Sequence, residues 1–452
     1  MGYEVSRREL LRKAGLGAGA LGAGSLLAAC GGGGGGGGGP LGGGDGGGPK
    51  HAASGDIEKG AKLQLLRWSQ FIDADKKQWQ KNTKAFTEKT GVPVTIEWED
   101  WTNIAAKAAT AARVGSGPDI AIAFYDTPQR FPSKVIDLSD VAKEIGGAAG
   151  GWFDAPQKYG MYEGKWIGIP LGANGAEWNY RKSMVKKAGF DEFPKDTDSL
   201  LELAKALHKD GNPMGLALGH AVGDANTWCH WLLWAFGGKT VDDNDKVVVN
   251  SPETVKALTY VNKLYEYFIP GTASWLDNNN NKAYLSGKLG ATINGISIYF
   301  AAREDAPKIG DDTMTAHMPV GPVGKPTQFH QISQAMVFAY TKYPNAAREY
   351  LKFMWSKDQY LPWMKASIGY TSPPLADYAE DPFWQTNPRY KAYQYAAKNM
   401  LWDGYSGDLG GHSSQALADY VVVDMISRAA TGQQSPKDAA SSAESRLKRI
   451  YG

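Results

Sequence analysis

Cys30 is the residue whose sequence context points most directly to a chemical reaction. It closes a Leu-Ala-Ala-Cys motif that follows a small-residue apolar stretch over residues 14–29, and the pair Arg7 and Arg8 precedes that stretch. This order is typical of a twin-arginine export signal that ends in a lipoprotein cleavage site. We therefore expect residues 1–29 to be removed as a signal and a diacylglycerol to be attached to the Cys30 thiol.

A transmembrane anchor is the alternative interpretation of the same stretch. The stretch has about 16 residues, whereas a helix needs roughly 20 to cross a bilayer, and glycine and alanine dilute its apolar character. Residues 31–39 are all glycine, and residues 42–48 are glycine apart from Asp45. Such a segment has no side chains to bury, so we expect residues 30–60 to be a flexible linker between the lipid and the folded chain.

No residue pattern indicates catalysis, a metal or a cofactor. Cys229 lies in an apolar helical run, which favours a buried structural thiol, and acylation of Cys30 would leave it without a disulfide partner. The seven histidines show no paired ligand spacing. An exported glycosidase would need two opposed carboxylates, but Glu97 and Glu99 would share one face of a strand. We therefore expect a protein that is not an enzyme and holds no cofactor or metal.

Composition limits the partners and the number of domains. Without residues 1–29 the formal net charge falls from +2 to 0, which argues against nucleic acid and anionic membrane as partners. A chain of 452 residues is too long for one core, so two domains or lobes are expected.

The folded chain begins with alternating strands and helices. The hydrophobic pattern predicts a strand at 63–68, a helix at 75–90, a strand at 92–98, a helix at 104–114 and a strand at 119–124. This order implies a mostly parallel sheet covered on both faces. Ligands bind beyond the carboxyl ends of the strands in such sheets, which here are the loops at 69–73, 99–102 and 125–127.

Later segments continue the alternation of helix and strand. A strand is expected at 164–171, running into residues 172–175, and further strands at 290–294 and 335–340. Ser251 and Ser435, each followed by proline, are expected to cap helices. Residues 278–281 are expected to form a polar turn before a helix at Lys282.

Five stretches carry a resemblance to a known family. They are FTEKTGVPV at 86–94, GSGPDI at 115–120, GKWIGIP at 164–170, GKLGATING at 287–295 and NAAREYLKF at 345–353. In this order, across residues 63–449, they resemble the bacterial extracellular solute-binding proteins of the family 1, sugar-binding type. The resemblance implies an α/β chain with a two-lobe periplasmic-binding-protein-like fold of type II, in which the ligand cleft lies between lobes joined by hinge segments.

The resemblance also implies a division of the chain and a role. Lobe 1 would comprise residues 61–172 and 331–378, and lobe 2 residues 175–330 and 382–452. Crossings between the lobes would lie near 171–175, 331–334 and 378–382. Hinge closure on a small-molecule solute would present the closed form, as a monomer, to the permease of an ABC importer. The protein would work at the outer face of the cytoplasmic membrane, held there by the lipid on Cys30.

The candidate ligand contacts are chosen for what a sugar offers, which is flat apolar faces and a rim of hydroxyls. Aromatic rings stack on such faces, while carboxylate, amide and indole groups bond the rim. In lobe 1 the candidates are Trp68, Gln70, Phe71, Tyr125 and Asp126, although Trp68 could belong to the core and Asp126 could cap a helix.

In lobe 2 and at the crossings the candidates are Asn174, Glu177, Trp178, Asn226, Trp228, Asn294, Ser297, Tyr299, Gln331, Gln334, Tyr405 and Asp408. The family commonly has a tryptophan soon after the glycine that corresponds to Gly295. Ile296 and Ser297 stand there in this chain, so the stacking role would pass to Tyr299 or be lost.

Charged solutes are the alternative ligand class in the same fold. A glycerol phosphodiester or a phosphate sugar would need Arg or Lys in the cleft, and only Arg181 and Arg303 can be placed near it. A polyamine would need several carboxylates beside aromatic rings. The candidates are mostly neutral, which favours a neutral carbohydrate. A structural lipoprotein without a saturable ligand site is a further alternative.

Overall fold

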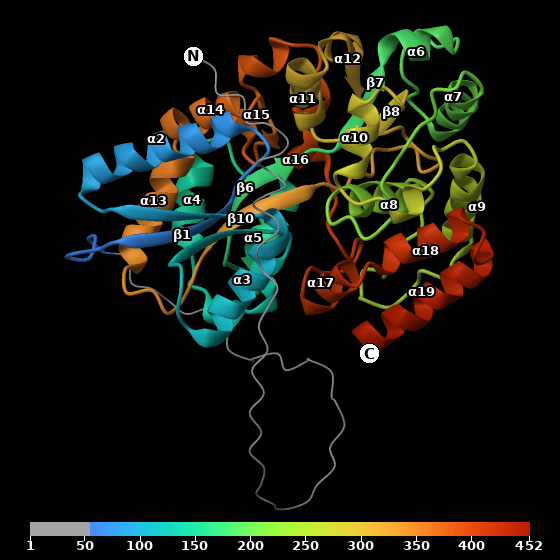
Figure 1. Ribbon diagram of the computed structural model, residues 1–452. Helices are drawn as coiled ribbons and strands as arrows, with labels where there is room; N and C mark the ends of the chain where they lie inside the picture. Colours follow the sequence, from blue (N-terminus) through green and yellow to red (C-terminus); the bar gives the residue numbers. More distant parts are fainter. Residues whose placement is uncertain (1–54) are drawn as a thin grey trace, which may run out of the picture. The chain divides into compact units, whose positions relative to one another are not determined.

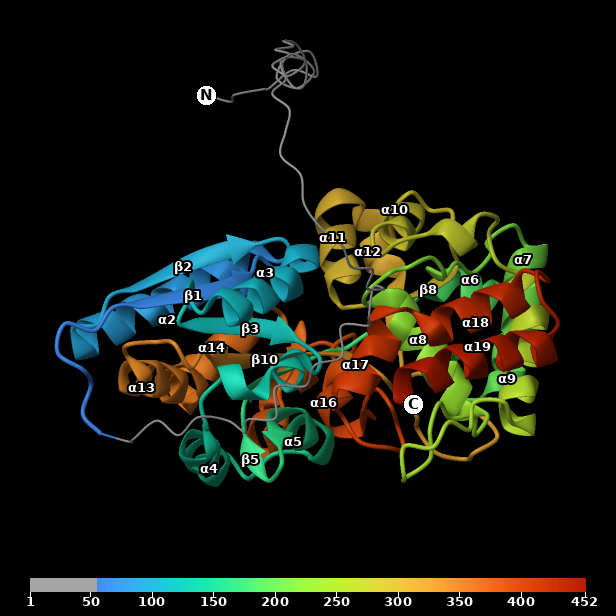
Figure 2. The same ribbon diagram turned by 90° about the horizontal axis from the view of Figure 1, so that it is seen from below.

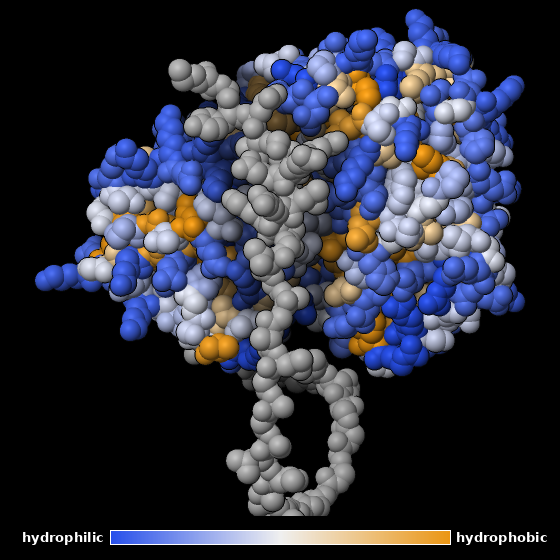
Figure 3. Space-filling model, in the orientation of Figure 1, coloured by the Kyte–Doolittle hydropathy of each residue, from blue (hydrophilic) through white to orange (hydrophobic). Residues whose placement is uncertain are grey.

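The computed structural model describes residues 55–452 (Figure 1). The predicted signal, Cys30 and all but the last residues of the predicted linker lie outside the described residues. Within the described part, no helix is both long and apolar enough to cross a bilayer. On the face seen in Figure 3, hydrophilic residues predominate and the apolar areas are small and separate.

A six-stranded sheet forms the centre of the first lobe (Figures 1 and 2). In spatial order its strands are β11 (Thr371–Ser372), β6 (Ile169–Asn174), β10 (Gln331–Val337), β3 (Ile120–Phe124), β1 (Leu63–Trp68) and β2 (Val94–Glu99). β1 pairs in parallel with β2 and β3, but the pairs β3–β10, β10–β6 and β6–β11 are antiparallel.

The expectation of a mostly parallel sheet is therefore wrong beyond its first three strands. β6 leaves the sheet at Asn174 toward the second lobe, and Gln331, the first residue of β10, pairs with Asn174. A strand that returns from the second lobe must enter at the edge from which the chain left, so β10 and β11 run opposite to the other strands.

Helices and short elements surround this sheet. They are α2 (Asp73–Thr90), α3 (Trp101–Val114), η1 (Thr127–Arg130), η2 (Pro132–Lys134), α4 (Ser139–Ala148), α5 (Asp154–Gly160), the hairpin of β4 (Met161–Tyr162) and β5 (Lys165–Trp166), α13 (Pro344–Trp355) and α14 (Lys357–Ala366). All residues of β3 are buried because its sequence, Ile-Ala-Ile-Ala-Phe, is apolar on both faces, as expected for a strand covered on both sides.

The start of α3 fixes one aromatic side chain at the edge of this sheet. Asp100 follows β2 directly, and its side chain accepts a hydrogen bond from the backbone N–H of Thr102 at 3.0 Å. This cap satisfies a helix donor that would otherwise have no partner. Trp101 is therefore the first residue of α3 and lies at the carboxyl ends of the parallel strands.

The second lobe contains a smaller sheet of antiparallel strands in the order β8 (Ala291–Asn294), β7 (Glu177–Arg181) and β9 (Thr313–Ala316). The helical elements around it are α6 (Lys182–Lys187), α7 (Thr197–Lys209), α8 (Asp224–Ala235), α9 (Pro252–Tyr265), η3 (Thr272–Ser274), α10 (Asn279–Leu285), α11 (Ser297–Asp305), α12 (Pro307–Asp312), α17 (Gly411–Ala418), α18 (Val421–Ala430) and α19 (Pro436–Tyr451). The polar turn expected at 278–281 is instead the beginning of α10.

The chain passes between the two sheets more than once. β6 leads into β7 through residues 175–176, and β9 leads back to β10 through residues 317–330. After β11 the chain forms α15 (Ala376–Ala379), η4 (Pro382–Gln385), η5 (Lys391–Tyr393) and α16 (Ala396–Asn399) before it reaches α17 (Figure 2). These passages bring strand ends of both sheets to the same region of the molecule.

A candidate ligand-binding cavity between the two lobes

A cavity lies between the lobes. Its walls come from the ends of β1 and β6 and the starts of α3 and β10 in the first lobe. In the second lobe they come from the starts of α8 and α10 and the end of β8. The lining residues are Trp68, Phe71, Trp101, Asn174, Gly175, Gly223, Asp224, Asp277, Asn281, Asn294, Gly295, Gln331 and Tyr370. A concave site at strand ends between two lobes is where folds of this kind bind small molecules.

Four aromatic rings form the first-lobe side of the cavity. The centroid of Trp68 lies 5.4 Å from that of Phe71, 6.5 Å from that of Trp101 and 5.9 Å from that of Tyr370. Phe71 is 51% exposed, which is unusual for so large an apolar side chain in this protein. The four rings therefore offer apolar faces to a molecule that enters the cavity.

Two carboxylates form the second-lobe side. Asp277 accepts hydrogen bonds from the backbone N–H groups of residues 222–224, at 2.8–3.1 Å. These groups lie at the amino end of α8, where the helix dipole favours negative charge. The Oδ2 atom of Asp224, the first residue of α8, accepts from the side-chain amides of Asn280 at 2.7 Å and Asn294 at 3.2 Å.

Both carboxyl groups have raised pKa values. Burial, and then the charge of neighbouring Asp277, raise the pKa of Asp224 well above the ordinary value of an aspartate. Burial also raises the pKa of Asp277, although the backbone N–H groups at the start of α8 oppose this shift. The cavity therefore holds two carboxyl groups that hinder each other's ionisation.

Amide side chains complete the polar lining. Asn174 donates to the Oε1 atom of Gln331 at 3.1 Å and accepts from the hydroxyl of Thr371 at 2.9 Å. Gln331 is only 6% exposed, yet its Nε2 group has no hydrogen-bond partner among the described residues. A buried donor without an acceptor is costly, and a bound solute could supply the missing acceptor.

Five of the predicted ligand-binding residues line this cavity. They are Trp68, Phe71, Asn174, Asn294 and Gln331. Gln70 follows β1, and its Oε1 atom is buried without a partner, but it is not among the lining residues. The remaining predicted residues lie elsewhere.

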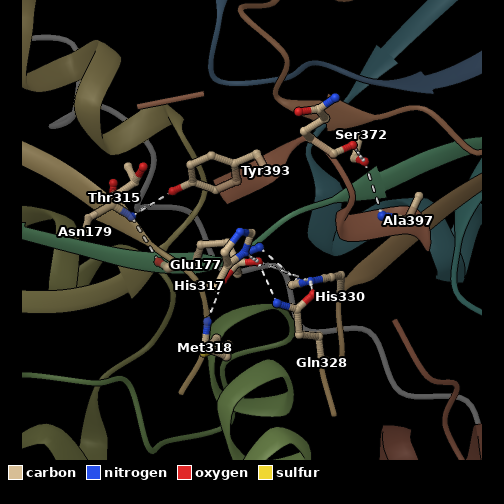
Figure 4. Close-up of polar contacts among 12 residues, drawn as sticks. Glu177, Asn179, Thr315, His317, Met318, Gln328, His330, Ser372, Tyr393 and Ala397 are labelled. Atoms are coloured by element: carbon tan, nitrogen blue, oxygen red, sulfur yellow. Dashed lines mark hydrogen bonds and ion pairs between the residues drawn. The ribbon is translucent and has the colours of Figure 1, made fainter. Parts of the chain in front are cut away.

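Glu177 lies at the crossing between β6 and β7 and is completely buried (Figure 4). Its carboxylate accepts from the backbone N–H of Met318 at 2.9 Å and from the side chain of Gln328 at 3.0 Å. His317 Nδ1 lies 3.7 Å and His330 Nε2 3.8 Å from Glu177 Oε1. Glu177 thus joins the first crossing to the second and does not line the cavity.

The pKa values of the two histidines beside Glu177 are shifted in opposite directions. The Glu177 carboxylate raises the pKa of the partly exposed His317. Burial lowers the pKa of His330 to about 3, so its ring is neutral at physiological pH. Burial raises the pKa of Glu177 itself, and His317 opposes that shift.

Tyr125, Asp126 and Gln334 lie behind the first-lobe wall. Tyr125 has a left-handed backbone with φ of 52°, and its hydroxyl donates to the carbonyl of Val222 in the second lobe at 3.2 Å. Gln334 donates to the carbonyl of Tyr125 at 2.6 Å. Asp126 is buried and makes no side-chain hydrogen bond as a cap of η1. None of the three lines the cavity.

Trp178, Trp228 and Asn226 belong to the interior of the second lobe. Both tryptophans are fully buried, and Trp228 Nε1 donates to the carbonyl of Ala217 at 2.7 Å. Asn226 donates to the carbonyl of Val222 at 3.1 Å. These side chains pack in the interior of the second lobe and are not among the residues that line the cavity.

The other predicted contacts lie outside the cavity lining as well. Ser297 and Tyr299 lie on α11, and the guanidinium of Arg389 covers the ring of Tyr299 at 4.9 Å. The ring of Tyr405 packs on Trp402 and Trp234. Asp408 forms an ion pair of 3.0 Å with Lys158 of α5.

Five side chains of the cavity lining are absent from the predicted set. Trp101, Asp224, Asp277, Asn281 and Tyr370 line the cavity. Trp101 could have been found, because it lies in a loop predicted at the carboxyl edge of the sheet. The others carry no such signal, since helix starts and isolated loop residues of these types are common throughout the chain.

The chain matches the family model described as bacterial extracellular solute-binding protein over residues 81–392. It is 28% identical over 294 residues to the diacetylchitobiose binding protein DasA of Streptomyces coelicolor, covering 62% of this chain and 67% of that one. Its fold is similar to that of a sugar transporter protein from Arthrobacter chlorophenolicus with bound laminaribiose (TM-score 0.73, 17% identity, 86% and 99% covered). It is also similar to that of an ABC transporter solute-binding protein from Agrobacterium radiobacter in complex with ribitol (TM-score 0.70, 17% identity, 86% and 99% covered).

These solved structures share the arrangement of two lobes around a cleft that the strand orders and crossings show here. Together with the match over most of the folded chain, they identify the protein as a member of the bacterial extracellular solute-binding protein family.

Proposed function

We propose that the protein binds a carbohydrate in the cavity between its lobes and delivers it to the permease of an ABC importer. The observation that supports this most is the lining of the cavity, where four aromatic rings face carboxyl and amide groups. Rings of this kind stack on the apolar faces of a sugar, and carboxylates and amides bond its hydroxyls. The relatives named for diacetylchitobiose, laminaribiose and ribitol support the same ligand class.

Phosphate-bearing solutes fit this cavity poorly. No Lys, Arg or His of the described chain is among its lining residues. Arg181 is paired with Asp312 at 2.9 Å, and Arg303 lies on α11 outside the lining. A phosphate would also meet the carboxylates of Asp224 and Asp277, which would repel it.

The cellular setting of this activity is part of the proposal. Cleavage before Cys30 and lipidation of its thiol would hold the chain at the outer face of the cytoplasmic membrane, with the glycine-rich residues as a tether. Residues 61–172 with 331–378, and 175–330 with 382–452, would move as two lobes around the crossings. The protein would act as a monomer and without catalysis, as a binding protein that closes on its solute.

The test is ligand-induced stabilisation of the mature chain, residues 30–452, with Cys30→Ser to prevent lipidation. Its melting temperature and tryptophan fluorescence would be recorded with monosaccharides, oligosaccharides, polyols, glycerol phosphodiesters and polyamines. A ligand at 100 times its Kd stabilises the folded state by about 2.7 kcal/mol, which is a shift of a few degrees.

Two variants connect that shift to the cavity. Trp101→Ala should abolish the shift, because it removes a ring from the first-lobe wall, whereas Asp243→Ala, in an exposed turn of the second lobe, should leave it unchanged. A carbohydrate shift that survives Trp101→Ala would place the binding site elsewhere. The absence of any shift from a cooperatively folded chain would contradict the proposal.

A further inference from the structure

The cavity holds two carboxyl groups that no cation among the described residues pairs with. Among the lining residues, all from the described range 55–452, Asp224 and Asp277 are the only acidic or basic ones. The groups that bond them are side-chain amides and backbone N–H groups, none of which carries a full positive charge. The buried carboxylate of Asp75, by contrast, is paired with a cation, since both guanidinium nitrogens of Arg67 donate to it at 2.6 and 2.8 Å.

The four aromatic rings of the cavity also have no cation beside them among the described residues. Arg67 lies over the ring of Trp79 at 4.1 Å, and Lys158 lies over that of Trp402 at 4.5 Å. By contrast, none of the cation–ring contacts found among residues 55–452 involves the four rings of the cavity. Aromatic faces beside carboxylates form a favourable environment for an ammonium group.

A second, independent feature indicates hydroxyl groups on the same ligand. The buried Nε2 group of Gln331 lacks an acceptor among the described residues. An ammonium ion has donors only and cannot supply that acceptor, whereas a hydroxyl or ring oxygen can. The second-lobe side of the lining, with Asp224 and Asp277, therefore suits a positive group. The first-lobe side, with the Nε2 group of Gln331, suits an oxygen acceptor.

We propose that the preferred solute is an amine-bearing carbohydrate, whose ammonium group lies beside Asp224 and Asp277 and whose oxygen atoms accept from Gln331. This inference rests on the proposed carbohydrate-binding function and specifies its substrate class. A bound ammonium would favour the ionised form of Asp224, whose pKa is raised by burial and then by the charge of Asp277.

The test compares sugars that differ in one substituent. Glucosamine, N-acetylglucosamine and glucose carry an ammonium, an acetamide and a hydroxyl at the same carbon, and their β-1,4-linked disaccharides form a second matched set. Binding to the mature chain would be measured by titration calorimetry at pH 6, where the amine is protonated. We expect the amine form to bind at least tenfold more tightly than both matched neutral forms, and added salt to reduce this preference.

Asp224→Asn should remove the preference for the amine while the neutral sugars still bind, since the amide keeps the shape of the side chain. Asp243→Asn, in the exposed turn, is the matched control and should retain the preference. Asp277→Asn is a second variant of the pair. Circular dichroism would show that each variant is folded, and the comparison of ligands on the unmodified chain does not depend on any variant.

The outcomes separate this inference from the proposed function. Equal or tighter binding of the neutral sugars would refute the amine preference and leave carbohydrate binding intact. Tight binding of putrescine or spermidine with no sugar binding would overturn both and favour a polyamine. Failure of every compound in both sets, from a folded chain, would also count against both.

Discussion

Asp126 and Asp403 form a buried carboxyl pair away from the ligand cavity, and this pair should make the stability of the protein depend on pH. Asp126 follows β3 and is 3% exposed, while Asp403 precedes α17 and is 1% exposed. The hydroxyl of Tyr159 hydrogen-bonds Asp403, but the Oδ2 atom of each carboxyl group has no other donor. Burial, and then interaction with Asp403, raise the pKa of Asp126, and burial raises that of Asp403. We therefore expect the folded pair to hold one proton between its two carboxyl groups above the ordinary pKa of an aspartate.

The magnitude follows from proton linkage. An aspartate in the unfolded chain has a pKa of about 3.9. Above that pH the unfolded chain has lost the proton that the folded pair retains, so unfolding releases one proton. The free energy of unfolding then falls by about 1.4 kcal/mol for each pH unit, until the pH passes the raised pKa of the folded pair.

Asp403→Asn is the informative change because an amide can donate to Asp126 without a titratable proton. As the pH rises above the ordinary pKa of an aspartate, we expect the free energy of unfolding of the variant to fall less steeply than that of the unmodified chain, by up to about 1.4 kcal/mol per pH unit. The assay is urea unfolding followed by tryptophan fluorescence at several pH values. Asp408→Asn, in the same segment but with an exposed side chain, should follow the unmodified chain. Parallel curves for Asp403→Asn and the unmodified chain would refute the shared proton.

Three further changes test the architecture. Asp75→Ala should lower the free energy of unfolding by about 3–5 kcal/mol in urea titrations, because it leaves the buried Arg67 guanidinium unpaired. Gly172→Ala should cost about 2 kcal/mol or more, seen as a lower melting temperature, because φ is 144° and a Cβ would lie 2.3 Å from the carbonyl oxygen of Ser372. Cys229 is fully buried and burial raises its thiol pKa, so a thiol reagent should modify it only in denaturant; reaction in the native state would contradict its burial.

Local sequence patterns predicted helices and strands well where a single pattern, such as an apolar run or a capping serine, was sufficient. The strand expected at 63–68 is β1 in full, because a continuous apolar run bounded by polar loops has few alternatives. Ser251 and Ser435 cap α9 and α19 as expected, each accepting from a backbone N–H three residues later. Strand direction in the larger sheet depended instead on how the chain returns from the other lobe, which no local pattern contains.

The first-lobe side of the site could be predicted from local sequence patterns, but the second-lobe side could not. The rule that ligands lie beyond strand ends identified Trp68 and Phe71 without knowledge of the second lobe. In that lobe the sequence favoured Asn226, yet Asp224 lines the cavity. The side chains of residues two apart on a helix differ in direction by about 200° around the helix axis. The rotation of α8 about its axis therefore determines whether Asp224 or Asn226 faces the cavity. That rotation is set by the packing of Trp228 and its neighbours, which the sequence alone does not specify.

Glu177 shows why polar residues near a crossing are hard to assign from sequence. A carboxylate that binds a solute and one that joins two crossings are both buried, and both need donors from distant segments. Here the donors are Met318 and Gln328, which belong to the return crossing, so the charge of Glu177 is stabilised before any ligand arrives. The buried Nε2 group of Gln331, by contrast, has no hydrogen-bond partner among the described residues. Buried groups without a partner also occur away from the cavity, as at Asp126 and Asp403, so an unpaired group indicates a solute site only where it also lies in the cavity lining, as Gln331 does.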